Sequence, residues 1–151
     1  MNPLDGELRD GSHFMSVRVY YEDTDFSGIV YHANYLRFME RGRTNHLRLL
    51  GAQHRALFEE ASAQAPRFAF VVRSMQIEFL KPACMDDALV VVTAPQDVKG
   101  ASITLEQRIL RMDELLVEAH VRVAFVCNGR ARPIPKALRT AMRADQERIG
   151  R

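Results

Sequence analysis

One long helical segment set among strand-like segments is the feature that most limits what this chain can fold into. Apolar residues recur at helical spacing over residues 34–50, whereas alternation at period two marks the other regular segments. These strand-like segments are residues 14–22, 68–80, 88–94, 102–111 and 115–127. Short links at Asp97–Gly100 and near Asp113 join the later strands as antiparallel hairpins. The order predicts an α+β fold in which a long central helix packs on a curved antiparallel sheet of about five strands.

The helix over residues 34–50 should bury a wide apolar arc against the sheet. Asn34, or the turn just before it, is its expected N-cap, and Gly51 is its expected C-cap, because these residue types are favoured at helix ends. Gly42 in mid-helix disfavours the helix by about 1 kcal/mol relative to Ala, which indicates that another element packs closely there. The remaining expected elements are a helix from Pro135 to about Arg148 and a short helix or ordered loop over residues 53–65.

Length and composition indicate one globular domain. The chain has 151 residues, a length typical of one domain, so we expect residues 14–151 to form the domain and the polar residues 1–13 to be a flexible tail. The net charge of +2 is too small to indicate nucleic-acid binding, and no apolar stretch approaches the ~20 residues that span a bilayer. The two cysteines fit a reducing compartment, and the N-terminus lacks an apolar signal core. We therefore expect a soluble, cytoplasmic protein.

The strongest candidate for chemistry is the segment YYEDTDFSGIVYHANY, which joins the first strand to the long helix. It places Glu22, Asp23 and Asp25 beside a histidine and a helix N-terminus. The free N–H donors of such a terminus can stabilise a developing oxyanion, and a carboxylate nearby can attack a carbonyl or activate water. The alternative is structural, since acids before a helix commonly cap it or form turns.

The same segment carries a resemblance to a known family. VRVYYEDTDFSGIVYHANYLRFMERGRTNHLRLLG resembles the hot-dog-fold acyl-CoA thioesterases of the 4-hydroxybenzoyl-CoA thioesterase family, and within it the bacterial subfamily associated with the Tol-Pal envelope system. The resemblance continues through FVVRSMQIEFLKPACMDDALVV and NGRARPIP, covering roughly residues 14–138. It implies the hot-dog fold and hydrolysis of an acyl-CoA thioester to a carboxylic acid and free coenzyme A.

The resemblance also implies site residues. Asp25 matches the catalytic carboxylate, and the backbone N–H of His32 matches the group that polarises the thioester carbonyl. The side chains of Tyr21 and His32 match further active-site members, which leaves Asp23 as a residue that shapes the loop. Asp25 would act as a nucleophile through a mixed anhydride or as a general base on water, and the sequence does not choose between the two.

Other reactive side chains are weaker candidates. Glu40 on the helix matches the position type used by another branch of hot-dog thioesterases, but it lies three residues from both Arg37 and Arg43, at ion-pair spacing, and we favour the ion pair. Cys84 follows a proline in a turn, and Cys127 ends an apolar strand face, where a small buried hydrophobe is typical. The sequence contains no nucleophile elbow, metal-binding or nucleotide-binding motif, so we expect no cofactor and no metal.

Basic residues gather toward the C-terminus, where residues 128–144 contain no acid. Guanidinium groups suit phosphates, and the resemblance implies that Lys99, Arg130 and Arg132 hold the phosphates of the coenzyme A substrate. We interpret Arg139 and Arg143 as surface charges.

The resemblance also implies assembly, as a homodimer or a homotetramer of paired dimers. Acyl carrier protein is an alternative thiol carrier to coenzyme A. Two other functions stay open: a (de)hydratase acting on acyl thioesters on the same fold, although no His-Phe-Pro-Gly-type segment is present, and a non-catalytic acyl-CoA-binding adaptor.

Overall fold

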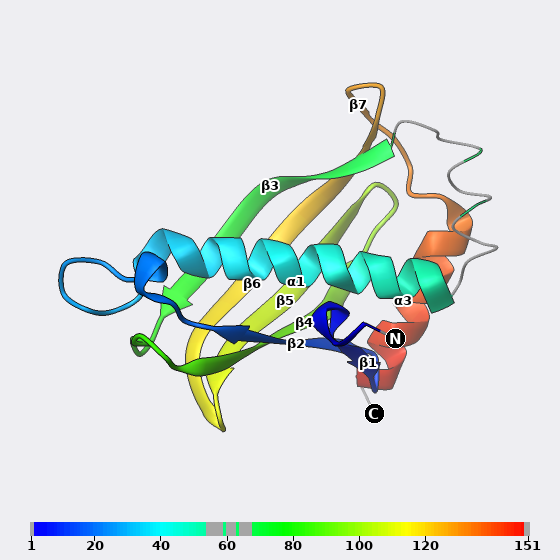
Figure 1. Cartoon of the computed structure of the whole chain (residues 1–151). Helices are drawn as coiled ribbons and strands as arrows, with labels where there is room; N and C mark the ends of the chain where they lie inside the picture. Colours follow the sequence, from blue (N-terminus) through cyan, green and yellow to red (C-terminus); the bar gives the residue numbers. More distant parts are fainter. Residues whose placement is uncertain (1, 54–58, 60–62, 64–67, 150–151) are drawn as a thin grey trace.

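The computed structural model describes residues 2–53, 59, 63 and 68–149. Five long strands and one long helix dominate these residues (Figure 1). The elements in chain order are η1 (Pro3–Asp5), β1 (Glu7–Arg9), β2 (Ser12–Arg18), η2 (Tyr21–Asp23), α1 (His32–Gln53), β3 (Phe68–Phe79), β4 (Ala88–Val98), β5 (Ser102–Arg111), β6 (Glu114–Cys127), β7 (Arg130–Ala131) and α3 (Lys136–Ile149). The strands expected from Phe68 to Cys127 are confirmed within a few residues at each end.

The strands form one antiparallel sheet in the order β1-β2-β4-β5-β6-β3, with β7 pairing on β6. The pairing register shifts between Val72 and Ser74 in β3 and between Pro95 and Asp97 in β4. Such bulges bend strands and increase their twist, which helps the sheet curve. Figure 1 shows α1 lying across one face of this sheet. The expected fold, a long central helix on a curved antiparallel sheet, is therefore confirmed.

The helix and the sheet lie close together at Gly42, which has no side chain. A Cβ added there would lie 3.0 Å from Val91 Cγ1 and 3.1 Å from Thr93 Oγ1, so the prediction of a close approach is confirmed. Gln107 on β5 links the helix to the neighbouring strand at this place. Its Nε2 donates to the Met39 carbonyl of α1 and to Thr93 Oγ1 of β4, both at 2.9 Å. This fully buried amide is satisfied by hydrogen bonds, as a buried polar group must be.

Of the two predicted N-caps of α1, the turn before Asn34 agrees with the structure and Asn34 does not, and the predicted end at Gly51 is wrong. The helix begins at His32, so Asn34 lies in its first turn, where its Nδ2 donates to the Asp23 carbonyl at 2.9 Å. At the other end the helix continues through Gly51 to Gln53. The helix or loop expected over residues 53–65 lies almost entirely outside the described residues.

The N-terminal segment also differs from the prediction of a flexible tail. Residues 3–5 form a 3-10 turn, β1 pairs with β2, and β2 begins at Ser12 rather than Phe14. Contacts distant in sequence hold this segment, because His13 Nε2 lies 2.7 Å from the Asp5 carbonyl and Arg48 pairs with Asp5 at 3.3 Å. β2 ends at Arg18, so Tyr21, expected in the strand, lies in η2 instead.

Within the described residues, no helix combines the length and apolarity needed to cross a membrane.

Candidate active site

Asp25 opens a tight loop between η2 and α1. Its N–H donates to the Ile29 carbonyl at 2.8 Å, its carbonyl accepts from Gly28 N at 3.0 Å, and Thr24 bridges to Val30. Gly28 has φ +83°, a conformation that favours glycine. The exposed Asp25 carboxylate accepts a hydrogen bond from Ser27 N at 2.8 Å. The loop thus fixes the position of the carboxylate while leaving it open to a ligand.

The loop is tied to the start of α1. The Asp23 carbonyl accepts from Tyr31 N at 2.9 Å and from the Asn34 side chain at 2.9 Å. The Asp23 carboxylate accepts from Tyr20 N at 2.9 Å, so Asp23 shapes the loop, as its sequence position predicts. These bonds hold Asp25 close to the N-terminal end of the helix.

A second turn, residues 83–87, supports the loop from the sheet side. The Ala83 carbonyl accepts from Val30 N at 2.9 Å, and Ala83 N donates to the Tyr35 hydroxyl at 2.9 Å; burial raises the pKa of Tyr35. The Asp87 carboxylate accepts from Cys84 N at 2.8 Å and from Arg111 at 2.7 Å. These bonds lower the pKa of Asp87, so its carboxylate is charged at neutral pH and keeps both hydrogen bonds.

His32 and Tyr21 flank the loop. His32 is the first residue of α1, and its exposed ring lies 4.6 Å from the Tyr31 ring and 6.1 Å from the Phe79 ring, between centroids. The first N–H groups of a helix have no partner within it, and the first turn of α1 contains no acid. The Tyr21 ring is 81% exposed. The loop that carries the Asp25 carboxylate is therefore tied to the end of α1 that begins with His32 and presents free N–H groups, and such groups can stabilise a developing oxyanion.

The basic residues form a second group. Lys99 lies in the turn between β4 and β5, and Arg130 and Arg132 follow β6. The backbone joins these segments, since Ile134 N donates to the Gly100 carbonyl at 2.7 Å and Arg132 N to the Phe125 carbonyl at 3.1 Å. All three basic side chains are exposed, and Lys99 Nζ lies 3.7 Å from Asp97.

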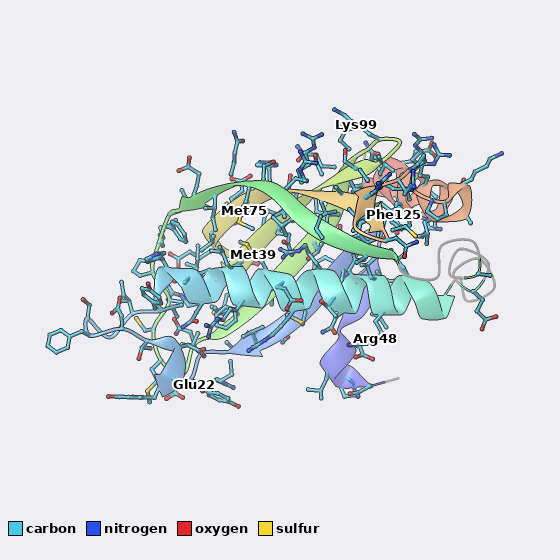
Figure 2. All side chains as sticks on the ribbon, turned by 90° about the horizontal axis from the view of Figure 1, so that it is seen from above. Glu22, Met39, Arg48, Met75, Lys99 and Phe125 are labelled. Carbon is cyan, nitrogen blue, oxygen red and sulfur yellow. The ribbon has the colours of Figure 1, made fainter. Side chains whose placement is uncertain are left out.

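The structure keeps these two groups apart within one chain. Figure 2 shows Glu22, beside the Asp25 loop, and Lys99 toward opposite ends of α1, a helix of 22 residues and thus about 33 Å long. Within a single copy the two groups of residues therefore lie far apart.

Three further predictions concern reactive side chains. Glu40 makes no ion pair within 4 Å in the described part of the chain, and its carboxylate accepts from Thr44 Oγ1 at 2.9 Å. Its charge still acts on Arg43, one of its two expected partners, since burial lowers the pKa of Arg43 and Glu40 opposes that lowering. Cys84 is exposed, and Cys127 is half-buried at the end of β6 rather than fully buried. Sequence reasoning missed Asp87 and Tyr35, whose partners are distant in sequence.

A cavity of about 200 Å³ lies between α1 and the sheet. Its lining is mostly apolar, with Arg43 at its edge donating to Gln107 Oε1 at 2.9 Å. The lining includes Leu47 from α1, Phe70 and Val72 from β3, Leu105 from β5 and Val123 from β6. A cavity of 150 Å³ lined in this way holds a benzene ring, so an apolar group of about that size fits here.

The fold is that of a thioesterase family, as comparison with known proteins shows. The chain belongs to the thioesterase-like superfamily, which it matches over residues 19–142, and its fold is the hot-dog fold. It is 44% identical over 136 residues to the acyl-CoA thioesterase YbgC of Haemophilus influenzae, covering 89% of this chain and 96% of that protein. It is 43% identical to the acyl-CoA thioester hydrolase YbgC of Escherichia coli, covering 81% of this chain and 89% of that protein. A probable thioesterase from Bartonella henselae superposes with a TM-score of 0.68 at 39% identity, covering 82% and 98% of the two chains.

Proposed function

We propose that this protein is an acyl-CoA thioesterase in which water cleaves the thioester to a carboxylic acid and free coenzyme A. Asp25 carries the reaction, as a nucleophile through a mixed anhydride or as a general base on water. The observation that supports this most is the hydrogen-bonded loop that carries the exposed Asp25 carboxylate and is tied to the start of α1. Relatives of similar length that are 43–44% identical are named acyl-CoA thioesterases or thioester hydrolases.

In this mechanism the helix N-terminus and the Asp25 carboxylate have separate roles. The N–H of His32 binds the thioester oxygen, which becomes more negative as the tetrahedral intermediate forms. The His32 and Tyr21 side chains line the entrance beside it. As a general base, the carboxylate takes a proton from water while the water oxygen attacks the thioester carbon, and collapse of the tetrahedral intermediate breaks the C–S bond and releases the thiolate of coenzyme A. As a nucleophile, the carboxylate attacks the same carbon and expels the thiolate, and water then hydrolyses the mixed anhydride to the carboxylic acid and free Asp25.

The proposed site is shared between two copies of the chain. β3 is the last strand of the sheet, and its side chains Val71, Val72 and Phe79 are exposed, as expected for an edge that pairs with another strand. The Phe79 end of β3 lies near His32, whereas its Phe68 end pairs with Cys127 beside the basic residues. Antiparallel pairing of two β3 strands therefore brings the Asp25 end of one copy to the basic end and the apolar cavity of the other.

A thiol-release assay tests the proposed activity. A panel of acyl-CoA and acyl-carrier-protein thioesters, from short aliphatic to aromatic acyl groups, is offered to the wild-type protein and to Asp25→Asn. We expect thiol release by the wild type only. Tight binding of acyl-CoA without turnover by the wild type would instead identify an adaptor, and hydration of an enoyl-CoA without thiol release would identify a hydratase.

Mixing two variants tests the shared site. Asp25→Asn lacks the carboxylate, and Arg132→Ala is weak at low substrate concentration. In a mixed dimer one of the two sites regains both residues, so the mixture should be more active than either variant alone. A fully active particle of 17.2 kDa in light scattering would contradict the shared site.

A further inference from the structure

Two neighbouring residues in the first turn of α1, Asn34 and Tyr35, bond to segments on either side of Asp25. Both are buried, with 7% and 3% of their surface exposed. Asn34 Nδ2 donates to the Asp23 carbonyl at 2.9 Å, and the Tyr35 hydroxyl accepts from Ala83 N at 2.9 Å. Since buried hydrogen bonds are shielded from water, breaking either one leaves a polar group unpaired. The start of α1 is therefore linked by side chains to both sides of the Asp25 loop.

Tyr35 reaches the loop through a single intermediate residue. Ala83 is fully buried; its N–H donates to the Tyr35 hydroxyl, and its carbonyl accepts from Val30 N at 2.9 Å. Val30 forms a bridge with Thr24, the residue before Asp25. A displacement of the Tyr35 hydroxyl is therefore passed through Ala83 to the backbone that carries Asp25.

The tip of the loop has no such link to the rest of the described chain. Its hydrogen bonds are internal: Asp25 N donates to the Ile29 carbonyl, Gly28 N to the Asp25 carbonyl, and Ser27 N to the Asp25 carboxylate. Phe26 is fully exposed, and nothing lies within 4 Å of the place that a Cβ on Gly28 would take. Figure 1 shows the loop extending beyond the start of α1. The position of Asp25 therefore depends on the hydrogen bonds at the two ends of the loop.

The Asn34 side chain also leaves the end of the helix open. Polar side chains at a helix start commonly bond to its free N–H groups. The Asn34 amide donates to the loop instead, and within the described residues the N–H groups of His32 and Ala33 have no hydrogen-bond partner. The first turn of α1 thus keeps N–H donors for a ligand while two of its side chains hold the loop.

We propose that Asn34 and Tyr35 are a pair of positioning residues that set the distance between the Asp25 carboxylate and the N–H of His32, an inference that rests on the proposed thioesterase function. The carboxylate, or the water that it activates, and the N–H must act on the carbon and the oxygen of one thioester. A displacement of ~1 Å in such a geometry lowers a rate about 10²-fold. His32, Asn34 and Tyr35 lie within one helical turn, so the pair fixes the loop to the element that carries the N–H.

Steady-state kinetics of Tyr35→Phe and Asn34→Leu test the pair. Tyr35→Phe removes only the hydroxyl group, and Asn34→Leu keeps the size of the side chain without its amide. We expect kcat to fall about tenfold in each variant with KM nearly unchanged, because positioning residues act on the reaction geometry rather than on binding. A rise in KM alone, or wild-type kcat in both folded variants, would overturn the proposal.

Asn45→Leu is the matched control. The Asn45 amide also lies on α1 and donates to a distant carbonyl, that of Leu4 at 3.2 Å, but on a later turn of the helix. This variant should lower the thermal unfolding midpoint as Asn34→Leu does and keep the wild-type kcat. An equal loss of kcat in Asn45→Leu would assign the effect to folding and contradict a positioning role.

The double variant Asn34→Leu/Tyr35→Phe distinguishes a pair from two independent links. Losses caused by residues that act as a unit do not multiply. If both links are needed to fix one geometry, the double variant should lose little more kcat than the less active of the two single variants. A loss equal to the product of the single losses would show that the two residues do not act as a pair.

Amide hydrogen exchange tests the same inference without catalysis. The N–H groups of Asp25 and Val30 are hydrogen-bonded in the loop and to Ala83. Tyr35→Phe and Asn34→Leu should each raise the exchange rate of at least one of them about tenfold, and Asn45→Leu should raise neither. Unchanged exchange would overturn the inference even in an active enzyme. Faster exchange in these variants of a protein whose wild type releases no thiol would instead place the failure in the proposed function.

Discussion

The two ends of α1 differ in how their functional side chains are held. At the Asp25 end, backbone hydrogen bonds from two loops fix a single carboxylate. At the α3 end, cations surround a cavity and lack carboxylate partners within the described residues. Attack on a carbonyl requires a fixed geometry, whereas phosphate binding requires unneutralised charge. The contrast fits the proposed function, in which the Asp25 end carries the reaction and the other end binds the substrate.

The largest effect should come from the fixed end. Asp25→Asn is nearly isosteric and keeps a side-chain acceptor for Ser27 N, but it supplies neither a base nor a nucleophile. We expect kcat to fall by about 10²-fold or more while the thermal unfolding midpoint changes little. Steady-state kinetics and circular dichroism measure the two effects, with Ser27→Ala as a control that keeps the carboxylate. Near wild-type turnover by folded Asp25→Asn would remove Asp25 from the mechanism.

A buried histidine pair belongs to neither end and should affect folding instead. The rings of His13 and His46 stack at 5.8 Å, and burial lowers the pKa of His46 to about 3 and also lowers that of His13. In the unfolded chain both histidines bind a proton below their ordinary pKa of about 6.5, whereas in the folded protein they bind it only at lower pH. Stability is therefore complete above that pH and decreases as the pH falls toward 3, by about 1.4 kcal/mol per pH unit for His46, or tenfold in the folding equilibrium.

Urea unfolding at pH 7, 6 and 5 measures this decrease. His46→Gln removes one titrating group, so its stability should depend less steeply on pH than that of the wild type, even if the variant is less stable throughout. Thr44→Ser, two residues away on the exposed face of α1, should keep the wild-type slope. Parallel slopes for His46→Gln and the wild type would contradict the role of His46.

The regular elements could be predicted because their periodicity is local, whereas their ends depend on distant contacts. β5 has the predicted bounds, since alternation of buried and half-buried residues marks it from Ser102 to Ile109. Asn34 has a capping side chain, yet this side chain bonds to Asp23 in the preceding loop, so the helix begins earlier. The N-terminal segment is polar, but Asp5 is held by Arg48 across 43 positions of sequence. No local pattern reports such a contact.

The candidate site divides in the same way. Asp25, Tyr21 and His32 could be predicted as site residues because they lie in one continuous motif, and their roles stay predictions. Asp87 carries no such signal: its role comes from a turn that meets the Asp25 loop only in the folded chain. Arg139 looks like a surface charge in the sequence, and only the cavity at α3 shows that its Nε is buried. Residues that lie close together along the chain could be predicted as a group, whereas residues that only folding brings together could not, whatever their type.

Substitution of Asp87 tests the support of the Asp25 loop while the Asp25 carboxylate stays unchanged. Asp87→Ala removes the acceptor for Cys84 N and for Arg111, so the turn that supports Val30 should become mobile. We expect kcat to fall about five- to tenfold with KM nearly unchanged, because a positioning residue acts on reaction geometry. Asp87→Asn, which retains an acceptor oxygen, should recover part of kcat, and Asp86→Asn, on the exposed neighbouring residue, should have no effect. A change in KM alone would contradict the positioning role.

The smallest effects should come from the exposed cations of the binding end. Arg132 lines the α3 cavity and Lys99 is exposed and pairs with Asp97 at 3.7 Å, so their contributions should differ. We expect Arg132→Ala to raise KM for acyl-CoA about fivefold and Lys99→Ala about twofold, with little change in kcat, since exposed ion pairs contribute little. An acyl-pantetheine thioester lacks the nucleotide phosphates, so both increases should disappear with that substrate. If the two variants lose equal activity on acyl-CoA and acyl-pantetheine, these residues act on the fold or on the reaction, and the division between a fixed catalytic end and a charged binding end is wrong.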